Sequence, residues 1–474
     1  MQPEAEDVEW LLGPGATLRR LAGLWRQQQD YSGLLRAALT LTAVALLPAF
    51  VALKLTMDPP DELEELAMCG FVAFITSGML VKAALFVHGG RALRQLVQLL
   101  YWTRGRYGSG RSGDATRSRY RKLSDRVYFY LQAAVVPAII GWVGSPLLSH
   151  SVLRGAEGSS DARRQLPAPA WLPLDIQVSP TYELLYAMLS FCLLIASETS
   201  VSVDSFFIHL MLMISAEIEV LSHNVSAMQR IRTKIPQYKA EDWCSSVQIN
   251  NETLKFSRSQ HSLNTTLITK DFSDEEIYFQ LVNNVRHHQA IFRLVAVLQS
   301  SMTVSIFVLL FVNMANLCSS MFVTAVLLQR DKNVTKALKA LLAIPPVLYQ
   351  TGLYCIFGNI ITDQVSDHEL LRVSCHTLID LTPPAVDQWY VRSEDGPCDG
   401  LKQSEKLVNC AFNCGWADCD IRFKRNLLIF MMRAMQPMEV TVGKTCKLSK
   451  QMLLQVLNGT YALLNMLYNF HGSG

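Results

Sequence analysis

Charged side chains are scarce in this sequence. Asp, Glu, Lys and Arg make up 18% of the 474 residues, hydrophobic residues make up 50%, and the mean hydropathy is +0.19. Soluble globular domains usually carry about 25% charged residues. The shortage argues against a set of soluble domains and is typical of a multi-pass membrane protein with sizeable loops. We therefore expect membrane lipid around the chain and no nucleic-acid partner.

Recognisable catalytic motifs are also missing. The sequence has no GxSxG, Walker, HExxH, Rossmann or kinase pattern. We therefore expect no enzyme activity and no cofactor. Five cysteines share one predicted loop without a CxxC pair, so we favour free thiols there, with a zinc site as the alternative. These cysteines are Cys375, Cys398, Cys410, Cys414 and Cys419.

Apolar stretches long enough to cross a bilayer, for which about 20 residues are needed, recur along the chain. They predict an all-α membrane protein with seven transmembrane helices. The piece 425–436 is too short to cross and ends at Pro437, so we interpret it as a half-helix before the last crossing. The crossings are expected near 34–56, 66–88, 127–149, 182–212, 291–328, 337–362 and 447–470.

Basic residues in short loops indicate the cytoplasmic side of a membrane protein. Loop 89–125 contains nine Lys and Arg residues, whereas loop 57–65 is charged only by Asp and Glu. This pattern predicts a cytoplasmic N-terminus and, after seven crossings, an extracellular C-terminus. No cleavable signal peptide is visible before the first crossing. The basic loop 329–339, with a glycosylation sequon at Asn333, would then lie outside.

Amide side chains, interrupted by Ala462 and Met466, form one stripe along the last predicted helix, from Ser449 to Phe470. At about 100° per residue the stripe covers roughly a third of the circumference. It is typical of a pore wall, and equally of a membrane helix whose amides bond to neighbouring helices. Its members are Gln451, Gln455, Asn458, Ala462, Asn465, Met466 and Asn469.

Aromatic and small polar residues gather in the outer halves of several predicted crossings. Such side chains suit a small volatile ligand held mainly by dispersion, with a polar anchor such as Ser145. Ordinary helix packing is the alternative for each of them. The candidate ligand-binding residues are Phe74, Trp142, Ser145, Tyr186, Phe191 and Tyr349.

Ionisable residues inside apolar segments are functional candidates, because charge is costly to bury in lipid. Lys82 lies near the cytoplasmic end of the second crossing, where we expect its amine to extend to the interface. Glu198, Asp204 and His209 lie where the long fourth helix is expected to leave the bilayer. We therefore assign no ion relay to them.

Four stretches of the sequence resemble the insect odorant receptors. Residues 422–437, RFKRNLLIFMMRAMQP, are similar to the family's basic segment and MMRAQKP signature, with Met-Gln in place of Gln-Lys. Residues 354–359, YCIFGN, resemble its YCYFGN motif. The Trp-Leu-Pro-Leu-Asp run at 171–175 resembles the outer lid before helix four, and 443–468 resembles the last crossing. The SEKL run at 404–407 follows later than in the family, which identifies an insertion before it.

This resemblance implies a subunit of an odorant-gated, non-selective cation channel in the plasma membrane of olfactory neuron dendrites. A small volatile ligand would bind in the outer half and open a central pore lined by the last helix, with a gate at Met466. The channel would be a homotetramer or a heterotetramer with the family's shared co-receptor. The implied pore and gate residues are Gln455, Asn458, Ala462, Asn465, Met466 and Asn469.

Two other functions stay open at this point, a metabotropic seven-helix receptor and a gustatory-type channel of the same fold. A metabotropic receptor requires an extracellular N-terminus, and the gustatory signature after Thr460 is not matched. The expected organisation follows the predicted loops. It comprises an N-terminal cytoplasmic segment 1–33, a ligand-binding helical domain 34–220, a cytoplasmic loop 221–290, helices five and six in 291–362, a long cytoplasmic loop 363–424 with the insertion, and a split helix seven in 425–470.

Overall fold

The structure, a computed structural model, is almost entirely helical where it is described. It describes residues 10–26, 30–61, 63–107, 111–156, 165–172, 178–246, 258–329, 334–362, 403–414, 416, 419–435, 441–442 and 446–472. The helices are α2 (Ala16–Leu21), α3 (Tyr31–Met57), α4 (Leu63–His88), α5 (Gly90–Tyr107), α6 (Arg111–Ala156), α7 (Thr181–Ser246), α8 (Arg258–Gln329), α9 (Val334–Leu341), α10 (Ile344–Thr362), α12 (Gln403–Phe412), α13 (Ile421–Ala434) and α14 (Lys450–Gly472). The strands β1 (Thr441–Val442) and β2 (Cys446–Lys447) pair antiparallel.

Six of the described helices are long and apolar enough to cross a membrane, namely α3, α4, α6, α7, α8 and α10. Five of them contain the first five predicted crossings, and α10 contains residues 344–362 of the sixth, whose first residues, 337–341, lie in α9. The last predicted crossing corresponds to α14, which has 23 residues and a more polar surface. At 1.5 Å per residue, that length also reaches across a bilayer's hydrocarbon core of about 30 Å. The predicted all-helical membrane fold is confirmed.

Local sequence signals explain where α3 begins. Asp30 is its N-cap, and its Oδ1 accepts hydrogen bonds from the Gly33 N–H at 3.0 Å and from Ser32 Oγ at 2.7 Å. An N-cap carboxylate satisfies an amide that has no partner inside the helix. The same two bonds stabilise the charged form and lower the pKa of Asp30 below its usual value. The chain therefore turns into its first membrane-length helix at a defined residue.

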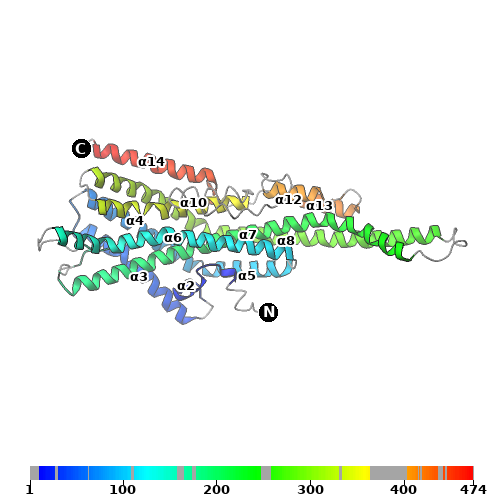
Figure 1. Cartoon of the computed structure of the whole chain (residues 1–474), viewed down its shortest axis with the longest axis horizontal. Helices are drawn as coiled ribbons and strands as arrows, with labels where there is room; N and C mark the ends of the chain where they lie inside the picture. Colours follow the sequence, from blue (N-terminus) through cyan, green and yellow to red (C-terminus); the bar gives the residue numbers. More distant parts are fainter. Residues whose placement is uncertain are drawn as a thin grey trace.

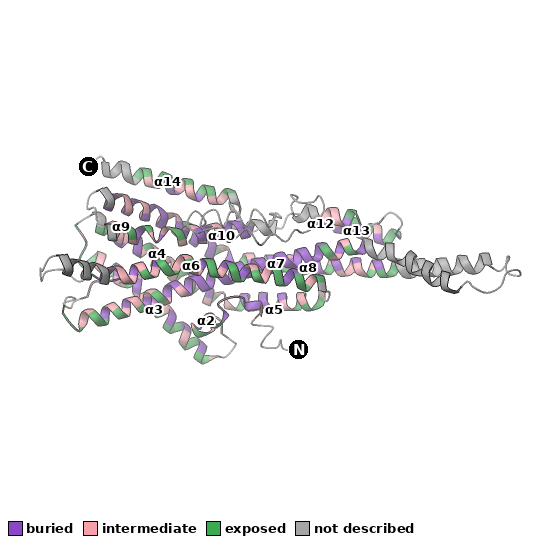
Figure 2. Cartoon of the chain, in the orientation of Figure 1, coloured by how far each residue is buried: buried purple, intermediate pink, exposed green. Residues whose placement is uncertain are grey.

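Figure 1 shows the long helices packed along one another, with α14 at one edge of the bundle beside α10. α14 contacts α8 and α10. Figure 2 shows that the buried residues concentrate on the central helices α7, α8 and α10, whereas α14 has many exposed ones. The buried core is therefore centred on α7, α8 and α10, and α14 packs on one side of the bundle.

The amphipathic helices α5 and α13 each bury one face. In α13 the buried residues Phe423, Leu427, Phe430 and Ala434 recur at steps of three and four. α13 packs on α8 and α12, and the β1–β2 hairpin separates it from α14. Residues 425–434 of the predicted half-helix therefore lie in α13, which starts four residues earlier, at Ile421, and ends at Ala434.

A buried charge cluster joins α6, α7 and α8. Arg117 donates to both carboxylate oxygens of Glu217, at 2.7 and 2.9 Å, and His287 Nε2 lies 3.2 Å from Glu217 Oε2. The ring of Tyr107 stacks on His287 with centroids 4.9 Å apart. A bidentate Arg–carboxylate pair fixes orientation as well as distance. This cluster sets how the three long helices are aligned.

Candidate ligand cavity

A cavity of about 130 Å³ lies where α4, α6, α7, α8 and α10 converge. Most of its wall is aliphatic, and Phe71 and Trp142 stack at one side with ring centroids 5.7 Å apart. Engineered apolar cavities of about 150 Å³ hold a benzene-sized molecule. The cavity is therefore of the size that suits a single ring or a short chain. Its apolar wall includes Val72, Ile75, Met79, Leu131, Val135, Ala138, Ile139, Leu193, Val308, Val312, Ala343 and Val347.

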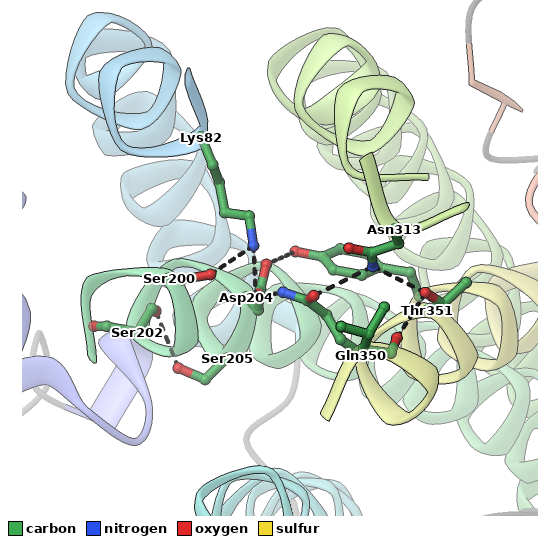
Figure 3. A network of polar contacts seen from close by, with 10 residues as sticks. Lys82, Ser200, Ser202, Asp204, Ser205, Asn313, Gln350 and Thr351 are labelled. Atoms are coloured by element: carbon green, nitrogen blue, oxygen red, sulfur yellow. Dashed lines mark hydrogen bonds and ion pairs between the residues drawn. The ribbon is translucent and has the colours of Figure 1, made fainter. Parts of the chain in front are cut away.

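The cavity wall also holds a buried ion pair. Lys82 Nζ of α4 lies 2.9 Å from Asp204 Oδ2 of α7 and donates to Ser200 Oγ at 2.9 Å. Asp204 also accepts from Tyr354 Oη at 2.8 Å and from Gln350 Nε2. Figure 3 shows Lys82 of α4, Ser200 and Asp204 of α7 and Gln350 of α10 converging on one another. A carboxylate with several donors tolerates burial because each lone pair finds a partner.

The amide network extends from this ion pair to α8. Asn313 Nδ2 donates to Thr351 Oγ1 at 2.9 Å and to Gln350 Oε1 at 3.2 Å, so Gln350 links Asn313 to Asp204 (Figure 3). Asn313 and Thr351 are both buried. Such a network is stabilising only when all its members have partners. Because the partners here come from α7, α8 and α10, the network fixes these three helices relative to one another.

The structure corrects the expectation for Lys82. Its side chain is 7% exposed and ends on Asp204, so it does not extend to the membrane interface. Asp204 lies within the core of the bundle, as does His209, whose Nδ1 is 2.9 Å from Ser124 Oγ. Glu198 accepts from Gln132 Nε2 at 2.9 Å. The prediction failed because a partner inside the bundle offsets the cost that would otherwise drive the amine outward.

Trp142 is the predicted ligand-binding residue that lines the cavity. Phe74 is 46% exposed and Phe191 63% exposed, on outer surfaces of α4 and α7. Tyr186 donates to the Val143 carbonyl, and Tyr349 is buried in the main core, while Ser145 is half-buried. None of these five is among the described residues of the wall, and their roles stay predictions.

Several polar lining residues were not predicted, namely Ser200, Asn313, Asn316 and Gln350. A signal for them exists in the sequence. Asn313 and Asn316 stand three apart in an otherwise apolar run of α8, so one turn presents two amides on neighbouring positions. Polar groups at membrane depth face the protein interior more often than lipid. The same reasoning that marked the stripe in the last helix therefore applies to α8.

The predicted pore residues of α14 lie on one exposed side of this helix. Gln455, Asn458, Ala462, Asn465 and Met466 are exposed, whereas Val456 and Thr460 are buried against the bundle. The side chain of Asn469 lies outside the described residues. Among the described residues, no group of three or more His, Cys, Asp or Glu side chains could hold a metal ion. The cysteines Cys375 and Cys398 also lie outside the described part.

A bundle of membrane-length helices around a small, mainly apolar cavity defines a multi-pass helical membrane protein with room for a small molecule. The model of the 7tm Odorant receptor family matches residues 62–368 and 401–461, and the chain belongs to this family. This family and fold are those of receptors rather than of enzymes. The resemblance seen in the sequence is confirmed. The match is interrupted at 369–400, inside the predicted loop 363–424.

Individual relatives agree with this assignment. Odorant receptor 10 of Aedes albopictus is 32% identical over 71 residues, which cover 14% of this chain and 19% of the relative. The insect olfactory receptor OR5 from Machilis hrabei has the same fold, with a TM-score of 0.66 and 14% identity over 98% of this chain and 96% of the receptor. Its complex with eugenol gives a TM-score of 0.67 at 13% identity, over 98% of this chain and 97% of the receptor.

Proposed function

We propose that this odorant receptor is a subunit of a ligand-gated, non-selective cation channel. A small volatile molecule would bind in the cavity, and α14 would line a central pore shared by four subunits. The family and the fold support the sensing role. The exposed polar stripe of α14 carries the pore assignment.

The physical argument for the pore starts from the cost of exposed amides in lipid. Gln455, Asn458 and Asn465 point away from the rest of the subunit. Facing hydrocarbon, each amide would lack hydrogen-bond partners and would cost several kcal/mol. Facing water or an identical stripe of another subunit, each would be satisfied. A ring of such helices around a water-filled axis meets that requirement.

Met466 is the proposed gate. It is 55% exposed in the subunit and follows Asn465 on the stripe. An apolar constriction in a water-filled pore closes it by expelling water, without a charged plug. Replacement by other residues would change how easily the narrow section hydrates.

The proposed ligand is a small organic molecule in the cavity between α4 and α10. The size of the cavity and the packing of Trp142 on Phe71 support this assignment. A solved relative of the same fold was determined in complex with eugenol. The partners would be membrane lipid and either identical subunits or the shared co-receptor, in the plasma membrane.

The test is to express the chain alone and with the co-receptor, and to record cation currents against an odorant panel. Currents with either arrangement support the channel, and the arrangement that yields them identifies the partner. Surface-expressed protein that passes no current with any panel member in both arrangements contradicts it. A tag on the N-terminus that antibodies reach in intact cells would contradict the proposed orientation and favour the metabotropic alternative.

A further inference from the structure

One buried amide at the cavity has no internal partner. Asn316 of α8 lines the cavity and is 1% exposed, and neither its Oδ1 nor its Nδ2 forms a hydrogen bond within the described part of the chain. Asn313, one turn away on the same helix, is satisfied by Thr351 and Gln350. Asn313 and Asn316 are therefore similarly buried and line the same cavity, but only Asn313 has hydrogen-bond partners among the described residues.

An unsatisfied buried amide is costly, so its persistence calls for an explanation. A buried polar group without a partner costs about 1–3 kcal/mol, and native proteins hold few of them. The amide of Asn316 offers both an acceptor and donors. A hydroxyl group complements it on both sides, because it donates to Oδ1 and accepts from Nδ2. An ether or carbonyl oxygen would satisfy the donor only, and a methyl group neither.

The charge of the cavity wall selects against ions. Lys82 and Asp204 are the charged residues among the described lining residues, and they neutralise each other at 2.9 Å. Asp204 also has Tyr354 and Gln350 as donors. A ligand with a net charge would enter without a counter-charge and would lose part of its hydration, which is costly against a mainly apolar wall. A neutral ligand meets no such penalty.

From these observations we propose that the cavity binds a small neutral alcohol or phenol, whose hydroxyl pairs with the Asn316 amide and whose hydrocarbon part packs on the aliphatic wall. The proposal rests on the proposed function only in taking this cavity as the ligand site. The volume of about 130 Å³ limits the hydrocarbon part to about one ring. Asn316 is then a specificity-determining residue for the hydroxyl group.

The experiment compares molecules of the same shape on purified full-length protein in detergent. The probes are p-cresol and p-xylene, which differ by a hydroxyl in place of a methyl group, together with 4-methylanisole and the anion 4-methylbenzoate. Affinities are measured by calorimetric titration and corrected for detergent partitioning of each probe. We expect p-cresol to bind about 10-fold or more tightly than p-xylene, because two hydrogen bonds form to a group otherwise unsatisfied. The anisole should fall between them, and the benzoate should not bind.

Variants assign the preference to one side chain. Asn316→Leu keeps the size and removes the amide, so the p-cresol to p-xylene ratio should fall close to one. Val308→Ala, at an apolar position of the same wall, should change both affinities together and leave the ratio intact. Detergent partitioning is the same for all variants, so it cancels in this comparison.

Equal affinity of p-cresol and p-xylene for the wild-type protein would overturn the proposal, even if Asn316→Leu did not fold. A preference that persists in folded Asn316→Leu, tighter binding of the benzoate, or no binding of any probe would overturn it too. Because binding involves no ion flow, the outcome is separable from the channel function. An intact p-cresol to p-xylene ratio without currents rejects the channel alone, and currents evoked equally by p-cresol and p-xylene reject the ligand class alone.

Discussion

At the scale of single residues, the bundle holds charges that the membrane would exclude. Lys82 and Asp204 come from α4 and α7 and meet at 2.9 Å with almost no exposure. The Coulomb attraction of such a pair is strong in an apolar interior, but each charge also loses its hydration. Each charge is therefore tolerated only because the other compensates it, and the hydroxyl of Tyr354 adds a hydrogen bond to Asp204.

Removal of one partner should be much worse than removal of both charges. We expect Lys82→Met to destabilise the protein by about 3–5 kcal/mol, since it leaves the Asp204 carboxylate buried and uncompensated. The double variant Lys82→Met with Asp204→Asn should recover most of this loss, because the amide is neutral and still accepts from Tyr354. Thermal unfolding of detergent-solubilised protein measures the difference.

A matched control for that experiment is Lys54→Met. Lys54 pairs with Asp58 four residues on, at the exposed end of α3. An exposed pair contributes about 0–1 kcal/mol, so this variant should unfold close to the wild type. A double variant no more stable than Lys82→Met alone would show that charge compensation is not what matters here.

At the scale of elements, close packing determines how α14 attaches to the bundle. Gly358 of α10 allows this approach, because a Cβ there would lie 2.5 Å from Leu448 Cβ, just before α14 begins. Real carbon atoms do not come so close, so a larger residue would displace the start of α14. Gly358 belongs to the YCIFGN motif at 354–359, whose packing role is thereby explained.

Gly358→Ala should therefore reduce ligand-evoked currents, because the stripe proposed to line the pore would shift with α14. Leu448→Gly in the same chain should restore part of the current by removing the clashing Cβ. Gly352→Ala is the control on the same helix, since a Cβ at Gly352 meets nothing within 4 Å. This control should fold at least as well as the wild type, because Ala is favoured over Gly inside a helix by about 1 kcal/mol. Equal currents from Gly358→Ala and Gly352→Ala would exclude the packing role.

The sequence predicted the elements well and the cavity wall poorly, for one physical reason. Length and hydropathy place each crossing, because the bilayer requires about 20 apolar residues. They do not give the rotation of a helix, because lipid is as apolar as the protein core. Trp142 faces the cavity, while the equally aromatic Phe74 and Phe191 face outward. Polar residues do indicate which side of a helix faces away from lipid, and the amides Asn313 and Asn316 of α8 both line the cavity.

At the scale of the whole molecule, one side of α14 is left uncovered by the rest of the described chain. Figure 2 shows exposed residues along α14 at the edge of the bundle. Val456 and Thr460 attach the opposite side of this helix to the subunit. A tetramer with these helices at its axis would place the stripe against water, which a lone subunit in lipid could not.

A substitution at the proposed gate tests this assembly. We expect Met466→Ala to raise the basal current several-fold without ligand, because a smaller apolar residue leaves a wider and more easily hydrated pore. Leu463→Ala is the control, since Leu463 lies three residues earlier on α14 and off the stripe. Whole-cell recording at matched surface expression measures both variants. Basal currents that stay at the wild-type level across several Met466 substitutions would contradict the gate.

One turn of α7 serves two neighbours at once. On one side Ser200 and Asp204 hold Lys82 at the cavity, and on the other the Ser202 carbonyl accepts from Arg19 at 2.8 Å. Burial lowers the pKa of Arg19 to about 9, so it stays protonated at neutral pH and keeps its bonds to the Leu12 and Pro14 carbonyls. Arg19 thus attaches α2 and the residues just before it to the turn of α7 that also lines the cavity.

Because one turn of α7 contacts both the cavity and the N-terminal segment, thermodynamic linkage can couple ligand binding to the docking of that segment. If occupancy of the cavity shifts the turn, it changes the free energy with which the N-terminal segment docks, and docking changes ligand affinity by the same factor. Arg19→Lys, which loses the planar fork of donors, would then alter affinity at a site it never touches. A binding titration beside the Arg20→Lys control measures that coupling directly. If this coupling holds, one turn of α7 would link ligand binding in the cavity to the docking of the N-terminal segment.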